Sequence, residues 1–178
     1  MELETINNYI VGIKVFIPEK FLDNRGCFFE SFNQKQFNIH KKFIQDNQSI
    51  SKKGVIRGMH MQIEPYAQVK LVRVIKGKIL DVVVDLRPRS KTYLKSLSIE
   101  LSDENRKILF VPAGCVHGFL SLEDDTIVSY KVNNYWNKES ERGFRFDDPT
   151  FAIDWKLKEY DIRDIIVSDK DKALPYFK

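Results

Sequence analysis

The sequence predicts an all-β protein, an antiparallel sandwich or barrel with little helix. Leucine and valine occupy positions 80, 82, 84 and 86, whereas Asp81 and Asp85 fall between them, which predicts a half-buried strand. Short strand-like runs separated by turn-prone residues recur at 13–17, 69–75, 108–111, 118–122 and 126–132. We expect only short helical pieces: residues 34–37, a turn at 102–105, and a segment within the last twenty residues.

Length and composition indicate one globular domain over residues 1–178, with 43% hydrophobic and 30% charged residues. The formal charge of +4 comes from basic residues scattered along the chain, with no dense basic block and no nucleic-acid module. Two interpretations stay open: a mild attraction for an anionic small molecule, or a solvated surface that is slightly positive. No nucleic-acid partner is expected.

The cysteines and the N-terminal residues predict a cytoplasmic protein. Cys27 and Cys115 are far apart and match no disulfide or zinc spacing, which favours a reducing compartment. No basic stretch followed by an apolar run begins the chain, and no apolar run approaches the roughly 18 residues of a membrane span. We expect neither export nor membrane insertion.

The chain contains three histidines, His40, His60 and His117, so candidates for acid–base chemistry are few. His60 follows Arg57 and Gly58 in the run Arg-Gly-Met-His-Met-Gln at 57–62. The glycine allows close backbone approach, so this run can place a phosphate-binding arginine beside a general base. The alternative is an ordinary histidine at a strand edge.

The second histidine motif, Pro-x-Gly-x-x-His over residues 112–117, resembles a signature of the cupin superfamily. That resemblance implies a double-stranded β-helix, a jelly-roll barrel. Metal-binding cupins carry His-x-His and a glutamate in their first signature, whereas this chain has His60, Met61 and Gln62 there. A zinc or iron site would lack ligands, so we predict no metal; a metal-dependent dioxygenase or isomerase is the alternative.

A longer resemblance covers nearly the whole chain: it is similar to the dTDP-4-dehydrorhamnose 3,5-epimerase family. Members of that family invert the C3 and C5 centres of 4-keto sugars linked to a nucleoside diphosphate, and they use no cofactor. The default substrate it implies is dTDP-4-dehydro-6-deoxyglucose, and the product is dTDP-4-dehydrorhamnose. The matching stretches are 23–33, 45–49, 57–62, 68–74, 81–87, 112–120, 130–136, 147–149, 153–155 and 168–171.

The reaction explains which catalytic groups the resemblance implies. A C4 ketone acidifies the protons on C3 and C5, so inversion needs a base, an acid on the opposite face, and a cation near the enolate oxygen. By resemblance His60 is the base, Asp171 its carboxylate partner, and Lys70 the cation, with Asp169 as the alternative partner. Without the resemblance, Lys70 would be taken for an exposed strand lysine.

Tyr130 is implied as the acid, and strand parity with Val128 and Val132 turns its phenol toward the barrel interior. A core tyrosine with a satisfied hydroxyl is the alternative. His117 shares a face with Phe119 and is expected to act at the carbonyl or to position the sugar.

The resemblance also implies the nucleotide site and a homodimer. Arg57 matches a diphosphate-binding arginine, and Trp136 stands where a tyrosine usually stacks on the base. Part of the family's nucleotide site crosses the subunit interface, so we expect a two-fold dimer. The full set of expected binding residues is Arg25, Phe28, Glu30, Gln48, Arg57, Gln62 and Trp136.

Several departures from the family pattern leave the substrate open. Met61 replaces an aromatic residue, Gln48 stands where histidine is common, and Leu94 with Ser96 replaces a glycine–tryptophan pair. A GDP-linked 4-keto heptose, or inversion at C3 alone, is the first alternative; a non-catalytic cupin that binds sugar nucleotides is the second. We expect the product to enter a surface polysaccharide such as capsule or lipopolysaccharide.

Overall fold

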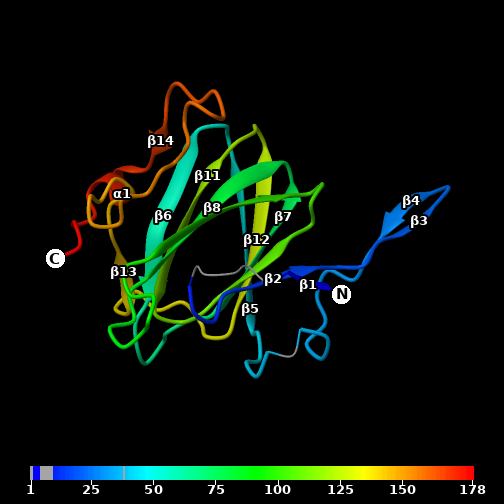
Figure 1. Cartoon of the computed structure of the whole chain (residues 1–178), viewed down its shortest axis with the longest axis horizontal. Coiled ribbons are helices and arrows are strands. Elements are labelled where there is room, and N and C mark those ends of the chain that lie inside the picture. Colours follow the sequence, from blue (N-terminus) through cyan, green and yellow to red (C-terminus); the bar gives the residue numbers. More distant parts are fainter. Residues whose placement is uncertain (1, 5–9, 38) are drawn as a thin grey trace.

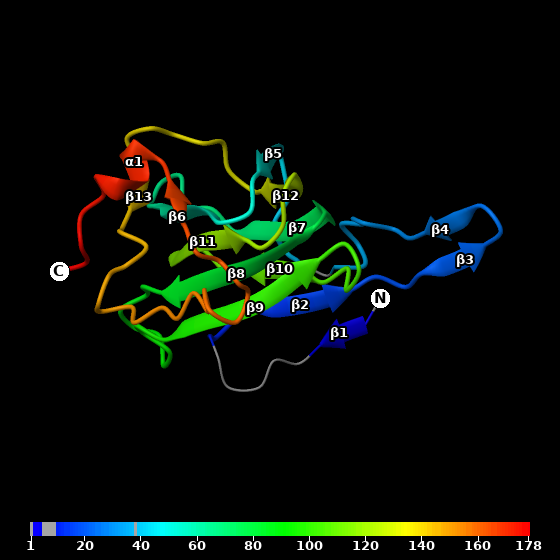
Figure 2. The ribbon, with the colours of Figure 1, turned by 90° about the horizontal axis from the view of Figure 1, so that it is seen from above.

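The computed structural model describes residues 2–4, 10–37 and 39–178. It consists of two facing antiparallel sheets with hardly any helix, which confirms the all-β prediction (Figures 1 and 2). The first sheet has the order β1-β2-β10-β7-β12-β5. Its strands are β1 (Glu2–Glu4), β2 (Lys14–Ile17), β5 (Gln45–Ser51), β7 (Lys70–Lys76), β10 (Ile108–Val111) and β12 (Thr126–Val132).

The second sheet has the order β13-β6-β11-β8-β9, and β14 pairs with β6 in parallel. Its strands are β6 (Val55–Gln62), β8 (Lys78–Asp85), β9 (Ser96–Ser102), β11 (Cys115–Ser121), β13 (Glu141–Gly143) and β14 (Ile166–Val167). A separate hairpin, β3 (Phe21–Asp23) and β4 (Gly26–Phe28), projects away from the barrel (Figures 1 and 2). The helix α1 (Asp169–Lys172) lies on the opposite side, near β6 and β13.

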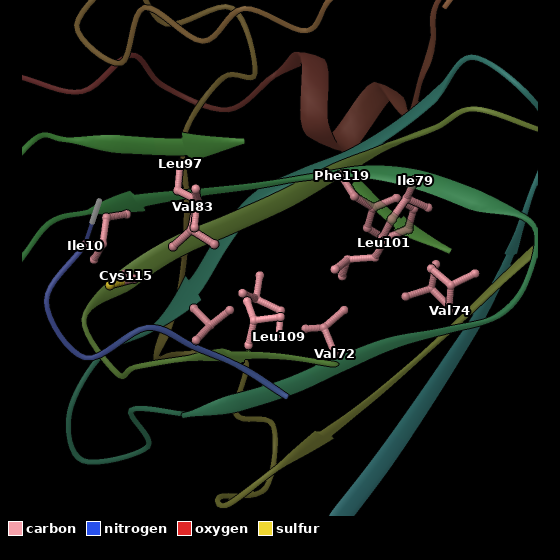
Figure 3. Packing of buried hydrophobic residues seen from close by; sticks show 13 residues of the cluster. Ile10, Val72, Val74, Ile79, Val83, Leu97, Leu101, Leu109, Cys115 and Phe119 are labelled. Carbon is pink, nitrogen blue, oxygen red and sulfur yellow. The ribbon is translucent and has the colours of Figure 1, made fainter. Parts of the chain in front are cut away.

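The main core fills the space between the two sheets. Val72 and Leu109 of the first sheet point toward Val83 and Leu101 of the second (Figure 3). These side chains alternate with outward-facing residues along each strand, as the period of two requires. The core closes one part of the barrel and leaves the part beside β5, β6 and β12 for a cavity.

A second core lies on the outer face of the β6-β11-β8 layer. Leu80, Val82 and Val84 pack there against residues of the C-terminal segment, among them Phe151 and Trp155. Strand β8 is therefore buried on both faces, and the prediction of a half-buried strand is wrong. Burying apolar surface on the second face needs this covering layer, which comes from residues far away in the sequence.

The other local predictions were mostly correct. Strands occur at or near all five remaining predicted runs, and residues 103–105 form the expected turn. Residues 34–37 form a turn and not a helix; the Asn33 side chain caps this turn by accepting the backbone N–H groups of Lys35 and Gln36. The last twenty residues contain α1. No helix among the described residues is long and apolar enough to span a membrane.

Candidate active site

A cavity of about 610 Å³ lies between the two sheets. Its walls come from β5, β7 and β12 on one side and from β6 and β11 on the other, with α1 at its edge. Along β5 the residues at 45, 47 and 49 turn inward while those at 46, 48 and 50 are exposed. Five predicted catalytic residues line this one cavity: His60, Lys70, His117, Tyr130 and Asp171.

His60 and Asp171 form a hydrogen-bonded pair. Nε2 of His60 lies 2.8 Å from Oδ1 of Asp171, and Oδ2 of Asp171 accepts the Gly58 N–H at 3.3 Å. Ser168 caps α1 by accepting the Asp171 N–H, which orients the carboxylate. Burial raises the pKa of Asp171, but the hydrogen bonds from His60 and the Gly58 N–H, together with the charges of His60 and Lys170, bring it below its ordinary value. The Asp171 carboxylate thus stays ionised and accepts the Nε2–H of His60. Nδ1 is then the ring nitrogen that is left to take up a proton.

Asp169, the alternative partner, is outside this arrangement. Its side chain is fully exposed and lies 3.6 Å from Nζ of Lys172. The two aspartates lie two positions apart on one helical turn, so their side chains point in different directions.

A second imidazole–carboxylate pair lies beside the first. Nε2 of His117 is 2.8 Å from Oδ2 of Asp81, and both side chains are buried. Burial lowers the pKa of His117, and the charges of Lys70 and His60 act in the same direction against the attraction of Asp81. His117 is therefore a neutral imidazole whose Nε2–H donates to Asp81, which leaves Nδ1 as a hydrogen-bond acceptor.

His60 and His117 are side-by-side neighbours on β6 and β11, where the two strands come close together. Their backbones are paired, and the register shifts between His117 and Phe119. Gly58 has a φ of +118°, and a Cβ at this position would lie 2.6 Å from the Cα of Gly118. Any side chain at Gly58 would force β6 and β11 apart and so separate the two imidazoles.

Lys70 is a buried cation from the opposite sheet. Its Nζ donates to the carbonyl oxygen of His60 at 3.2 Å. Burial lowers the pKa of Lys70 to about 8, although the charges of Asp81 and Glu141 raise it. At neutral pH Lys70 is charged in a low-dielectric setting, where its field acts strongly on a developing oxyanion.

Tyr130 comes from β12, in the sheet that faces His60. Its phenol is partly buried and packs against the main core. Burial raises the pKa of Tyr130, Arg57 lowers it and Glu141 raises it, with the net result above the ordinary value. The phenol keeps its proton at neutral pH and can donate it.

The rim of the cavity carries groups suited to a phosphate and an aromatic base. Arg57 is anchored on β5, because its Nε donates to Ser51 Oγ at 3.1 Å and Nη2 donates to the Ile50 carbonyl at 3.2 Å. Trp136 also lines the cavity, with 55% of its surface exposed. The exposed indole offers a stacking surface and the anchored guanidinium an anion site, and the two are held near opposite ends of β5, because the Trp136 N–H donates to Gln45 and Arg57 donates to Ser51.

The comparisons with known proteins agree with this geometry. The family model described as dTDP-4-dehydrorhamnose 3,5-epimerase matches residues 7–178. The chain belongs to this epimerase family. The epimerase of Methanothermobacter thermautotrophicus is 45% identical, over 96% of this chain and 92% of the relative.

Solved structures of the family show the same fold. The Bacillus anthracis epimerase, solved with TDP and PPi bound, aligns with a TM-score of 0.91 and 39% identity over 99% of this chain and 100% of its own. The Legionella pneumophila enzyme, solved in complex with dTDP-4-keto-L-rhamnose, aligns with a TM-score of 0.87 and 35% identity over 99% and 100%. The predicted cupin-type jelly-roll barrel is thereby confirmed.

Three predicted binding residues of the family pattern lie outside the cavity of their own chain. Arg25 and Phe28 belong to the projecting β3–β4 hairpin, and Arg25 pairs with Asp23 at 2.6 Å. Glu30 follows the hairpin and accepts a hydrogen bond from Asn33. The structure does not bring these residues to His60 within one chain, because the hairpin extends in the other direction (Figure 2).

Two further binding predictions are qualified by the geometry. Gln48 borders the cavity but lies on the exposed face of β5, whereas Gln45, Asn47 and Ser49 face inward. Gln62 lines the cavity, yet its side-chain amide is bonded twice to the backbone of Asn137. The amide of Gln62 therefore holds the 137 loop in place.

Sequence reasoning missed several residues of the site. Asp81 partners His117, and its position within a strand of valines and leucines was the available signal. Glu141 and Lys170 form an ion pair at 2.8 Å on the cavity wall. Nothing in the sequence links them, because they lie on β13 and α1. In the part of the chain that is described, no three metal-binding side chains gather at one point.

Proposed function

We propose that this chain inverts C3 and C5 of dTDP-4-dehydro-6-deoxyglucose to give dTDP-4-dehydrorhamnose, using its own side chains as acid and base. One observation carries the proposal. His60, paired with Asp171, and Tyr130 enter one cavity from two facing sheets, so a sugar ring between them has a base on one face and an acid on the other. The substrate follows from the names of relatives up to 45% identical to this chain.

Each inversion consists of two proton transfers. His60 takes the proton from the carbon next to the C4 ketone, and the electron pair of that C–H bond moves onto the carbonyl oxygen as an enolate. Asp171 stabilises the imidazolium that forms, and the Lys70 cation stabilises the enolate oxygen. Tyr130 then delivers a proton to the opposite face of the same carbon and the ketone re-forms; solvent takes the proton from His60 and returns one to Tyr130.

His117 is proposed to position the sugar. Because Asp81 accepts the Nε2–H and the ring is neutral, Nδ1 of His117 can accept a hydrogen bond from a sugar hydroxyl, and the ring adds no second positive charge beside Lys70. The Glu141–Lys170 ion pair at the wall supplies a carboxylate and an ammonium for the sugar hydroxyls and the phosphate.

The nucleotide is proposed to lie between Arg57 and Trp136 at the rim, completed by a second subunit. The β3–β4 hairpin exposes Phe28 to 71% and Leu22 to 71% while extending away from its own barrel. Exposed apolar side chains on such an arm need a partner surface. A two-fold dimer in which each hairpin reaches the partner's nucleotide site accounts for them. Light scattering should give twice the chain mass, and Phe28→Asp should give the single-chain mass.

Solvent exchange tests the reaction. The protein is incubated with dTDP-4-dehydro-6-deoxyglucose in deuterium oxide, and the position of deuterium and the sugar configuration are read by NMR. We expect deuterium at both C3 and C5 and the rhamno configuration. Exchange confined to C3 would indicate a 3-epimerase, and exchange only with a GDP-linked 4-keto heptose would change the substrate. No exchange with either sugar would leave a binding module and contradict the proposal.

A further inference from the structure

The edge of the His60 ring faces a position without a side chain. Gly143 on β13 pairs with His60 on β6, so the two backbones are neighbours in the sheet. A Cβ built on Gly143 would lie 3.1 Å from Cδ2 of His60 and 2.8 Å from Cδ1 of Leu174. These distances are shorter than ordinary carbon–carbon contacts, so the imidazole edge and the leucine already occupy the space that a methyl group would need.

Leu174 cannot move far from this position. Its N–H lies 3.4 Å from the carbonyl oxygen of Asp171, so it belongs to the same turn as the carboxylate that binds His60. Arg145, two residues after Gly143, donates to the Lys172 carbonyl at 2.7 Å and to the Pro175 carbonyl at 3.1 Å. The backbone on both sides of Leu174 is thus tied to Arg145, two positions beyond the end of β13.

The contacts around the imidazole therefore come from one short stretch of chain. Asp171 binds Nε2, and the Leu174 side chain and the adjacent Cδ2 edge of the ring both border the space that Gly143 leaves open. Hydrogen bonding alone leaves a ring free to pivot about the bonded nitrogen, whereas a packed edge removes that freedom. With both contacts in place, Nδ1 keeps one direction into the cavity.

We propose that Gly143 and Leu174 are positioning residues that hold the His60 imidazole in its proton-accepting orientation. This inference rests on the proposed function, in which His60 is the base. It assigns no contact with substrate to either residue. Gly143 acts through the absence of a side chain, and Leu174 through its packing at the ring edge.

Gly143→Ala and Leu174→Ala test the inference. Because φ at Gly143 is not positive, alanine is compatible with its backbone and acts only through its methyl group. We expect Gly143→Ala to lower kcat for dTDP-4-dehydro-6-deoxyglucose by about tenfold to hundredfold, with KM changed less than about threefold. In the double variant the new methyl fills part of the space that Leu174 leaves, so the combined loss should be smaller than the product of the single losses.

The imidazole of His60 is also observed directly. With three histidines in the chain, ring-nitrogen NMR spectra can be assigned, and both variants should shift the His60 resonances in unliganded protein. Leu157→Ala is the matched control, a partly buried leucine of the second core whose loss should lower the melting temperature and leave kcat and the His60 resonances unchanged.

Three outcomes overturn the inference. Folded Gly143→Ala with wild-type kcat and His60 resonances is the first. The second outcome applies if Gly143→Ala does not fold. Leu174→Ala, which only removes atoms, then decides, and unaltered His60 resonances in that variant overturn the inference. The third is an equal resonance shift in Leu157→Ala. Lack of turnover by the unaltered protein contradicts the proposed function instead, because the spectra need no substrate.

Discussion

The carboxylate of Asp171 lies 2.8 Å from Nε2 of His60, although 111 positions separate the two residues in the sequence. Strand β6 carries the imidazole, and α1, held on β6 through the Gly58 N–H, carries the carboxylate. Asp169 on the same helix points into solvent. One helical turn therefore contains both the aspartate that we propose to assist His60 and a matched control for it.

Asp171→Asn should lower the rate of proton exchange at C3 by roughly 10²–10⁴-fold, because the imidazolium loses its counter-charge and the ring its fixed tautomer. Asp169→Asn should leave the rate unchanged. Deuterium uptake under single-turnover conditions measures both. Similar rates in the two variants would show that Asp171 does not assist the base.

Tyr130→Phe should separate abstraction from inversion. The variant keeps His60 and Lys70, so deuterium should still enter the substrate, while inversion at one centre, which we predict to be C5, is lost for want of the proton donor. NMR of the sugar reports label and configuration at each carbon. Tyr93→Phe, an exposed tyrosine away from the cavity, is the control. Normal yield of the rhamno product from Tyr130→Phe would rule out the assigned role.

Activity should fall as the pH rises through about 8, because the pKa of Lys70 is about 8 and only the charged amine stabilises the enolate. A profile of kcat against pH measures this alkaline limb. In Lys70→Arg the guanidinium stays charged at higher pH, so the limb should move upward. If the alkaline loss of activity occurs at the same pH in Lys70→Arg, it is due to the titration of another group.

Lys70→Met should stabilise the fold while abolishing turnover. The pKa of Lys70 is lower in the folded chain than in the unfolded chain. The cost of burying its charge therefore lowers the free energy of unfolding, and this cost is fully present below pH 8. We expect a gain of about 1–3 kcal/mol in the free energy of unfolding at pH 7. Chemical denaturation should show this gain shrinking between pH 8 and 10.5. Lys78→Met, at a partly exposed lysine near Glu100, should change stability by less than about 1 kcal/mol.

Local sequence patterns predicted local structure well and burial less well. The alternation from Leu80 to Leu86 located a strand, since side-chain direction in a strand depends only on parity. It did not predict that both faces of this strand are buried. The face carrying Val82 is covered by Phe151 and Trp155, which lie about 70 positions later in the sequence. The helix expected at 34–37 is a single turn, capped by the side chain of Asn33.

The residue types and their order in the chain were enough to determine the epimerase family, the all-β class, and the base, acid and cation as candidates. Tertiary structure alone decided that Asp171 rather than Asp169 meets His60, that Asp81 and Glu141 belong to the site, and that the hairpin with Arg25 leaves its own barrel. The physical reason is range: side-chain periodicity and motif chemistry act over a few residues, whereas a hydrogen bond across 111 positions depends on how two sheets close around a cavity.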